Sequence, residues 1–235
     1  MSLIIPSASC DCDLYTSLSI CAPCSDCASK RAQRRRMTQK LQRFSDLVLS
    51  LVLALILLPI FAVLALLIRL DSPGPTLFIQ KRVGKHGRVF NFYKFRSMVM
   101  NAEQIRHQIE SANERAGPVF KMRLDPRITR VGGFIRKYSL DELPQLLNVI
   151  QGDMSLVGPR PALPLEVAQY TEYERQRLAI MPGVTGLWQV SGRADLSFEE
   201  SVALDLYYAD HQSSALNARI LWLTIPAILS GRGAY

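Results

Sequence analysis

The feature that most constrains this chain is an uncharged apolar segment, residues 47–68, which follows a basic arm. As a helix it would be about 33 Å long, enough to cross the hydrocarbon core of a bilayer. The segment starts late and has a long basic lead, which is unlike a cleaved signal peptide. The sequence therefore predicts a membrane helix.

The position of this helix in the membrane has two interpretations. Pro59 lies mid-segment, where a proline removes a backbone hydrogen bond and clashes with the preceding turn. Both flanks are basic, and the positive-inside rule assigns both to the cytoplasmic side. A helix that breaks at Pro59, enters and returns satisfies both observations, with Ser50 as a candidate partner for the freed backbone groups. An ordinary kinked span is the alternative, because transmembrane helices tolerate proline.

The residues before this segment are basic and rich in cysteine. The chain has 28 Lys and Arg against 20 Asp and Glu, a net charge of +8, which favours anionic partners. No cysteine follows residue 30, so disulfides cannot hold the body together, as expected in a reducing compartment. The cysteines either bind a metal or belong to a disordered tail. They are Cys10, Cys12, Cys21, Cys24 and Cys27.

The predicted fold class is α+β and mostly helical, with a single re-entrant membrane helix, a small β-hairpin and amphipathic interfacial helices. The runs TLFIQKRV and RVFNFYKF, joined by residues 84–87, predict the hairpin. The last apolar segment, with Trp222, lies in the membrane interface or packs on the core. Other helices are predicted over residues 98–115, 139–151, 162–180 and 197–210. The predicted domains are an extension over 1–36, a re-entrant helix over 37–70 and a cytoplasmic-face catalytic domain over 71–235.

Two adjacent carboxylates, Asp141 and Glu142, are the strongest local signal for chemistry. In a structural interpretation, Ser139-x-x-Glu142 is a capping box at a helix start. In a functional one, one carboxylate attacks phosphorus and the other holds a divalent cation. Nearby cationic segments suit phosphate oxygens. They contain Lys94, Arg96, Arg127, Arg130, Arg136, Lys137 and Arg160.

A second candidate is the segment from Pro182 to Arg193. Its three glycines and one proline are typical of a shaped loop whose backbone can contact a ligand. The alternative is a tight connector that places Trp188 in the core.

Three long motifs follow one another along the chain: YKFRSM, DPRITRVGGFIRKYSLDELPQLLNVIQGDMSLVGPRP and MPGVTGLWQVSGR. They resemble the bacterial sugar transferases of the monotopic polyprenyl-phosphate phosphoglycosyl transferase superfamily, in its small, catalytic-core form. The resemblance covers residues 37–210, and this family starts the assembly of exopolysaccharide, capsule, O-antigen or glycoprotein glycans. Two departures are the cysteine-rich extension and Leu58, where many relatives have serine before the proline.

The resemblance implies a role for each candidate residue. Asp141 matches the nucleophile and Glu142 its magnesium-binding partner, while Pro59 matches the helix-breaking proline of a re-entrant anchor. The residues implied near the substrate phosphates are Arg136, Arg160, Lys94 and Arg96. Those in the stretch associated with the nucleotide are Gly183, Thr185, Gly186, Gln189 and Arg193.

The implied reaction transfers sugar-1-phosphate from a UDP-sugar to undecaprenyl phosphate through a phospho-aspartyl sugar intermediate, with release of UMP and with Mg²⁺ as cofactor. The implied location is the cytoplasmic face of the bacterial inner membrane. The expected partners are the UDP-sugar, undecaprenyl phosphate and membrane lipid, and a homo-oligomer is compatible with the sequence. The motifs select neither the sugar nor the glycan pathway.

Two other classes of protein compete with this interpretation. A scaffold without turnover would have no need of the intact Asp141–Glu142 pair among basic motifs. A nucleic-acid binder would explain the basic arm, but the sequence contains no recognisable nucleic-acid module. We therefore expect an enzyme with no nucleic-acid partner.

Overall fold

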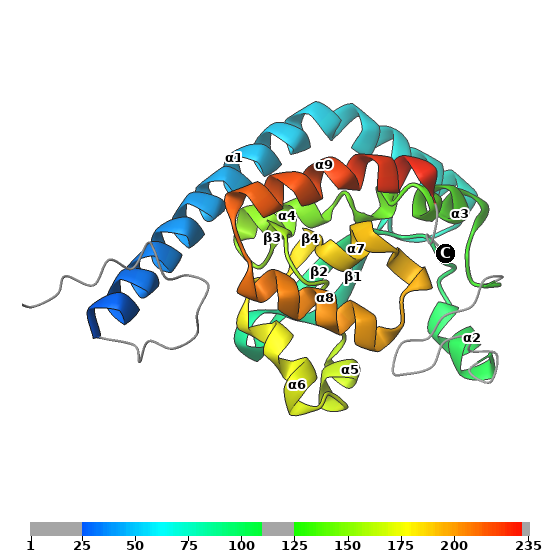
Figure 1. Cartoon of the computed structure of the whole chain (residues 1–235). Coiled ribbons are helices and arrows are strands. Elements are labelled where there is room, and N and C mark those ends of the chain that lie inside the picture. Colours follow the sequence, from blue (N-terminus) through cyan, green and yellow to red (C-terminus); the bar gives the residue numbers. More distant parts are fainter. Residues whose placement is uncertain (1–24, 110–124, 232–235) are drawn as a thin grey trace, which may run out of the picture. The chain divides into compact units, whose positions relative to one another are not determined.

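The computed structural model describes residues 25–109 and 125–231 (Figure 1). The chain divides into two compact units, residues 1–42 and 43–235, and the following sections concern the second unit. Four of the five cysteines lie outside the described residues, and the side chain of Cys27 is not described. Both interpretations of the cysteines therefore fall outside this structure.

Helix α1 (Ser25–Asp71) contains the predicted apolar segment, with Pro59 inside it. From Lys40 to Asp71 it is long enough to cross a membrane, and an 18-residue stretch within it has a mean hydropathy of 3.3. Figure 1 shows α1 bending in its light-blue to cyan part, beyond its midpoint, and a re-entrant path remains a prediction. Ser50 does not support the bend, because its buried hydroxyl has no hydrogen-bond partner among the described residues.

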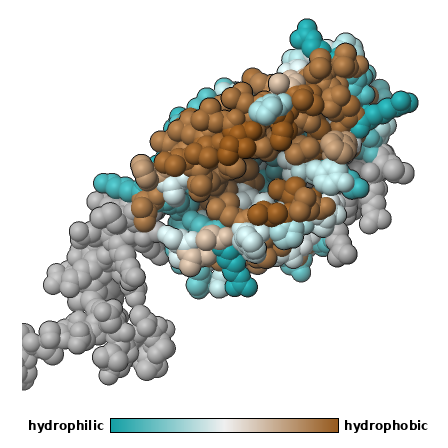
Figure 2. All heavy atoms as spheres, turned by 90° about the horizontal axis from the view of Figure 1, so that it is seen from above, coloured by the Kyte–Doolittle hydropathy of each residue, from teal (hydrophilic) through white to brown (hydrophobic). Residues whose placement is uncertain are grey.

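The outward face of α1 is apolar and exposed, from Val48 through Leu70. Seen from above, these side chains form a broad brown surface (Figure 2). Helix α9 (Ser214–Ser230) lies on the same side of the domain (Figure 1) and exposes Trp222, which is 74% accessible, and Leu229. Soluble monomers rarely keep so large an apolar surface in water. The surface is what a membrane-bound protein requires.

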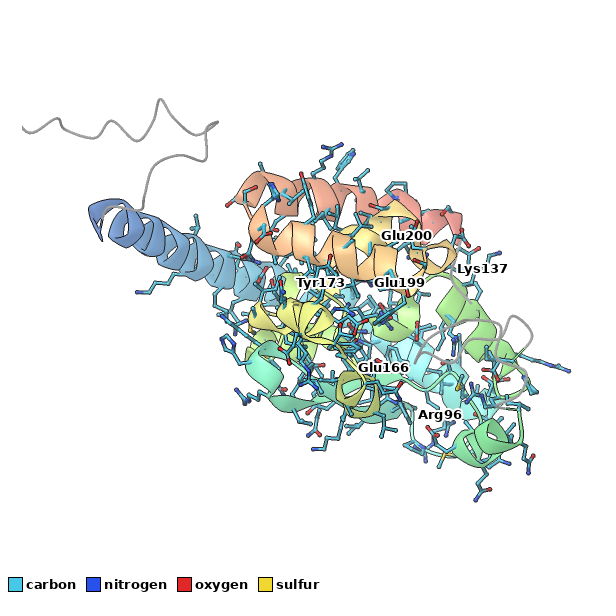
Figure 3. All side chains as sticks on the ribbon, turned by 60° about the horizontal axis from the view of Figure 1, so that its bottom comes forward. Arg96, Lys137, Glu166, Tyr173, Glu199 and Glu200 are labelled. Atoms are coloured by element: carbon cyan, nitrogen blue, oxygen red, sulfur yellow. The ribbon has the colours of Figure 1, made fainter. Side chains whose placement is uncertain are left out.

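Arg96 fixes the end of α1. Its guanidinium donates hydrogen bonds to the backbone oxygens of Ser72 at 2.6 Å and Pro73 at 2.8 Å, and to the Ser72 hydroxyl at 2.9 Å. Figure 3 shows Arg96 beside the cyan end of α1. Burial lowers the pKa of Arg96, and the nearby Asp71 opposes this effect.

The predicted hairpin is confirmed. Strands β1 (Leu77–Val83) and β2 (Val89–Phe95) pair antiparallel and are joined by the short helix η1 (Lys85–Gly87). In this register Phe78 lies opposite Lys94 and Arg82 opposite Phe90. Directly opposed residues share a face of the sheet, so Lys94 and Arg82 project to the same side.

The helical predictions are confirmed in part. Residues 197–210 form α8 (Phe198–Asp210), and the last apolar segment forms α9. Within 98–115, the described residues are helical over α2 (Ala102–Gln108). The predicted helices over 139–151 and 162–180 break into shorter elements: η3 (Leu140–Glu142), α4 (Gln145–Gln151), α5 (Pro164–Ala168), α6 (Glu172–Arg175) and η4 (Gln176–Ala179). Three further elements were not predicted: α3 (Arg130–Lys137), α7 (Leu187–Ser191) and η5 (Arg193–Asp195).

A short parallel pair, β3 (Ser155–Val157) and β4 (Gly183–Thr185), joins two distant motifs. A Cβ added at Gly183 would lie 2.0 Å from the backbone nitrogen of Gly158, so only glycine allows this approach. The pairing brings the Pro159–Pro161 segment beside the loop that follows Thr185.

Two apolar clusters form the core of the second unit. One contains Phe92, Val149 and Tyr208, and the other contains Leu64, Ile68, Phe95 and Ile135. The second cluster is completed by Phe61, whose ring centroid lies 5.5 Å from that of Phe95. Helix α1 therefore covers the core with its inner face and forms the apolar exterior of the domain with its outer face.

Candidate active site

A cavity of about 630 Å³ gathers most of the predicted site residues. Its walls come from the hairpin, α3, η3, the loop after β3, α5, η4 and α7. Its volume lies within the range of small-molecule sites. The predicted residues that line it are Lys94, Arg96, Arg136, Asp141, Glu142, Arg160, Thr185, Gln189 and Arg193.

The carboxylate pair stands on a sharp turn after α3. Ser139, at φ 52°, adopts the left-handed region and leads the chain into η3, where Asp141 is buried and Glu142 half-buried. The capping-box interpretation of Ser139 is wrong, because its side chain makes no cap hydrogen bond. Its hydroxyl instead accepts a hydrogen bond from Arg193, at 3.3 Å. Such strained residues cluster at functional sites.

Two contacts hold this turn against the hairpin. A Cβ at Gly132 in α3 would lie 2.0 Å from the Ser97 carbonyl oxygen, so glycine lets α3 pack on the backbone after β2. The buried amide of Asn148 in α4 donates to Asn91 at 2.6 Å and accepts from the Tyr93 backbone at 3.1 Å. The elements on both sides of Asp141 are thus attached to the strand that carries Lys94.

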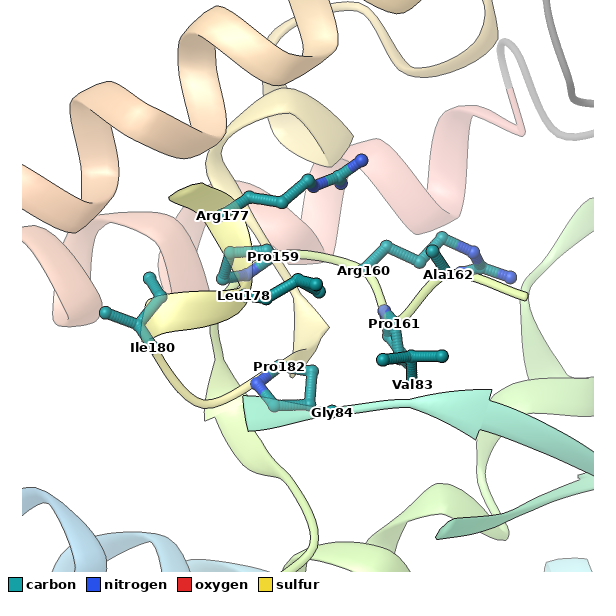
Figure 4. Close-up of a pocket in the computed structure, with 10 residues that line it drawn as sticks. All are labelled: Val83, Gly84, Pro159, Arg160, Pro161, Ala162, Arg177, Leu178, Ile180 and Pro182. Atoms are coloured by element: carbon teal, nitrogen blue, oxygen red, sulfur yellow. The ribbon is translucent and has the colours of Figure 1, made fainter. Parts of the chain in front are cut away.

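Glu142 forms an ion pair with Arg160. The Nη1 of Arg160 lies 2.6 Å from Oε1 of Glu142, and this neighbouring charge raises the pKa of Arg160. Prolines on both sides fix the backbone of Arg160, and Figure 4 shows its side chain extending to the same side as that of Arg177. The predicted phosphate-binding arginine is therefore already oriented by one member of the carboxylate pair.

Burial and charge act against each other at Asp141. Burial, followed by the adjacent Glu142, raises the pKa of Asp141 to about 6, while Lys94, Arg136 and Arg160 oppose the increase. Burial also lowers the pKa of Lys94 to about 8, against the attraction of Asp141. At neutral pH both groups are charged, so a buried carboxylate faces cations and remains available as a nucleophile.

Sequence reasoning missed Arg82, which also lines the cavity. Its Nη1 donates to the Pro161 carbonyl at 3.0 Å, and burial, with the nearby Arg160, lowers its pKa to about 10. The signal that could have found it is the hairpin alternation, which places Arg82 on the same face as Lys94.

A second missed group contains Arg177, Asp205 and Tyr170. Arg177 lines the cavity, forms a buried ion pair with Asp205 and donates to the Tyr170 hydroxyl at 3.2 Å. Burial raises the pKa of Asp205 to about 6, against the attraction of Arg177. The two charged residues are far apart in the chain, so no local motif pairs them.

The glycine-rich segment divides into two parts. Thr185, Gln189 and Arg193 reach the cavity, whereas Gly183 and Gly186 pack against the backbone of Gly158. Trp188 lines the cavity, and its side chain is half-buried with the indole nitrogen fully buried. The nucleotide-binding roles of these residues remain predictions.

Other predicted cations have protein partners. The Arg96 donors described above bind backbone oxygens at the end of α1, and Arg127 pairs with Asp125 at 2.7 Å. A phosphate-binding role for Arg96 stays a prediction, and in this structure its guanidinium binds the backbone that follows α1.

The carboxylates suit a metal ion that arrives with its substrate. No cluster of three or more His, Cys, Asp or Glu side chains able to hold an ion occurs among the described residues. Mg²⁺ often binds one or two carboxylates together with substrate phosphates. Glu142 with Asp141 fits that arrangement better than a site made by protein groups alone.

Comparison with known proteins identifies the class. The family model described as bacterial sugar transferase matches residues 37–231, and the chain belongs to this family. It is 49% identical over 71% of its length to the galactosyl transferase CpsE of Streptococcus agalactiae. It is 42% identical over 86% of its length to the undecaprenyl-phosphate galactose phosphotransferase of Salmonella typhimurium.

A relative of similar size is the exopolysaccharide production protein ExoY of Sinorhizobium fredii, which is 37% identical over 83% of this chain and 88% of its own length. The matches cover only 37% of CpsE and 43% of the Salmonella protein. The chain thus spans less than half of these two longer relatives.

Proposed function

We propose that this protein transfers sugar-1-phosphate from a UDP-sugar to undecaprenyl phosphate through a phospho-aspartyl sugar intermediate. The observation that carries the proposal is Asp141, a buried carboxylate facing Lys94, Arg136 and Arg160 in one cavity. Only a strongly anionic substrate matches that set of cations. The names of the relatives support the sugar phosphate and the lipid carrier.

In the first step, a carboxylate oxygen of Asp141 attacks the phosphorus that bears the sugar. A new P–O bond forms, the P–O bond to the bridging oxygen breaks, and UMP leaves with that oxygen and its electron pair. Lys94, Arg136 and Arg160 bind the phosphate oxygens and stabilise the charge that develops on them. Covalent catalysis thereby separates the soluble donor from the lipid acceptor in time.

In the second step, a phosphate oxygen of undecaprenyl phosphate attacks the same phosphorus. The bond between phosphorus and the Asp141 oxygen breaks, which regenerates the carboxylate and releases the lipid diphosphate sugar. Atoms and charge balance without any oxidant, reductant or water.

Mg²⁺ is part of the proposal. Glu142 would hold the ion beside Asp141, and a bound Mg²⁺ neutralises diphosphate charge and assists a phosphate leaving group. For Glu142 to do so, its ion pair with Arg160 has to loosen, which would free Arg160 for the donor phosphates.

We place the enzyme at the cytoplasmic face of the bacterial inner membrane, with α1 re-entrant and α9 in the interface. The support is the long apolar helix with basic flanks and the exposed apolar face of α9. The product would begin an exopolysaccharide, capsule, O-antigen or other glycoconjugate.

The test is UMP release from a panel of UDP-sugars by the full chain in detergent, with undecaprenyl phosphate and Mg²⁺ present. We expect release from at least one donor and a decrease of about 10⁴-fold or more in Asp141→Asn, which removes the nucleophile. Near-native release by a folded Asp141→Asn protein would disprove the assignment of the nucleophile.

A further inference from the structure

The cavity contains one carboxylate that the proposed reaction does not use. Glu166, in α5, is only 8% exposed, yet it lines the cavity. Figure 3 shows it where α5 faces the centre of the domain. Buried carboxylates are costly unless they have partners, so its presence calls for a ligand or a structural role.

A structural role accounts for one of its two oxygens. The Oε2 of Glu166 accepts a hydrogen bond from the Leu163 backbone nitrogen at 2.8 Å, which fixes the start of α5. Among the described residues, Glu166 makes no ion pair. Its other oxygen, Oε1, does not belong to the fully buried polar atoms that lack a hydrogen-bond partner. That oxygen is therefore oriented by the fold and available as an acceptor in the cavity.

The chemistry of the surrounding cavity excludes two ligands for this oxygen. Phosphate oxygens carry negative charge and would be repelled by a carboxylate. A metal ion shared with Asp141 and Glu142 would need the three acidic groups to be clustered, and no such cluster exists in the described part of the chain. What remains is a neutral group with a donor hydrogen, such as a sugar hydroxyl.

Hydrogen bonds along the backbone place Glu166 beside the hairpin. The segment that leads into α5 is bound to β1, because the Val83 backbone nitrogen donates to the Ala162 oxygen at 2.9 Å and Arg82 donates to the Pro161 oxygen at 3.0 Å. Leu163, the next residue of that segment, donates to Glu166. Glu166 therefore lies on the hairpin side of the cavity, and its charge acts on both Arg82 and Arg160.

We propose that Glu166 is a sugar-recognition residue, whose free carboxylate oxygen accepts a hydrogen bond from one ring hydroxyl of the hexose being transferred. The inference rests on the proposed transferase function and adds a contact to the sugar itself. A charged acceptor of this kind favours a donor that presents a hydroxyl at the contacted carbon over one that lacks it.

The experiment combines one substitution with deoxy donors. Glu166→Gln retains an amide oxygen that can accept from the Leu163 nitrogen but removes the charge. We expect kcat/KM for the preferred UDP-hexose to fall about 10- to 100-fold, the range for a hydrogen bond to a charged group. For wild type, removal of one particular hexose hydroxyl should cause a similar loss. In Glu166→Gln, kcat/KM for that deoxy donor should be little lower than kcat/KM for the parent UDP-hexose, because the substitution and the deoxy change remove the same contact.

Glu174→Gln is the matched control. The Oε2 of Glu174 likewise accepts a hydrogen bond from a backbone nitrogen, that of Thr171, at 2.6 Å. This contact lies at an exposed helix start, and Glu174 does not line the cavity. We expect it to retain wild-type kinetics with every donor. Thermal unfolding of both variants identifies a loss that arises from instability, and the deoxy donors test wild type even if Glu166→Gln does not fold.

The outcomes separate this inference from the proposed function. If wild type releases UMP but no hexose deoxy donor loses more than a few-fold, the inference is wrong and the transferase assignment stands. If the loss follows 2′- or 3′-deoxyribose donors instead, Glu166 binds the nucleoside and the inference is also wrong. If wild type releases UMP from no UDP-sugar, the proposed function itself fails.

Discussion

At the scale of single residues, Asp141 must satisfy two opposing demands. As the proposed nucleophile it needs its negative charge, whereas burial favours the neutral acid. Lys94, Arg136 and Arg160 reconcile the two demands, because their positive charges act on the Asp141 carboxylate and oppose the effect of burial on its pKa. The same cations would later hold the phosphate, so activation and binding depend on the same side chains.

This balance predicts a bell-shaped pH profile for kcat/KM. Activity should fall below about pH 6, where Asp141 binds a proton, and above about pH 8, where Lys94 loses one. In Lys94→Gln we expect kcat/KM to fall about 100-fold. Its alkaline limb should disappear, and its acid limb should move to higher pH, because a cation that favours ionised Asp141 has gone.

The measurement is UMP release between pH 5 and 9, with Lys137→Gln as the control, because this exposed lysine does not line the cavity. Unchanged acid and alkaline limbs in Lys94→Gln would show that Lys94 does not govern the ionisation of Asp141.

The residue scale also shows what one local pattern can predict. Among the described residues, the pattern Ser or Thr followed by Glu three positions later occurs at Thr171, Ser197 and Ser139. At Thr171 and Ser197 it forms a capping box, with reciprocal hydrogen bonds to Glu174 and Glu200. At Ser139 the left-handed backbone turns the side chain away. The sequence therefore identified the carboxylates of the site but not the strained turn that presents them.

At the scale of elements, predictability follows the range of the interactions. The hairpin and α8 carry their own alternation and capping signals, and both formed as predicted. The pair β3–β4 has only three residues in each strand and depends on a partner distant in sequence, so no local periodicity marks it. The predicted helix over residues 162–180 is divided because Thr171 caps a new helix.

The path of α1 gives the prediction at this scale. Basic residues flank the apolar segment on both sides, and Figure 1 shows α1 bending in its light-blue to cyan part. With the five native cysteines changed to serine, we expect Thr38→Cys and Pro75→Cys to react with an impermeant thiol reagent from the same side of sealed vesicles. Position 75 is exposed and leaves the contact between Ser72 and Arg96 intact.

Cysteines placed at His86, which is exposed in η1, and at Ser230 serve as references for the catalytic side and for the far end of the chain. Labelling of positions 38 and 75 from opposite faces of the membrane would establish a spanning helix and end the re-entrant interpretation.

At the scale of the whole molecule, the prediction concerns the order of events. A single cavity contains the proposed nucleophile, Asp141, and the cations that act on it, so donor and acceptor phosphates would use the cavity in turn. Incubation with a UDP-sugar alone should release up to one UMP per active site and leave labelled sugar phosphate on Asp141. Steady-state kinetics with both substrates should be ping-pong. Sequential kinetics without trapped label would favour direct attack by the lipid.

The double use of α1 has a practical consequence for anyone who wants a water-soluble version of this protein. Truncation before Asp71 would remove the hydrophobic anchor, but it would also remove Leu64 and Ile68 and leave Phe95 and Ile135 without cover. Each lost side chain of this size costs roughly 1.5–3 kcal/mol of burial, a large share of the stability of a small domain. A soluble version would instead need polar substitutions on the outer face of α1, because the domain after Asp71 depends on the inner face of that helix.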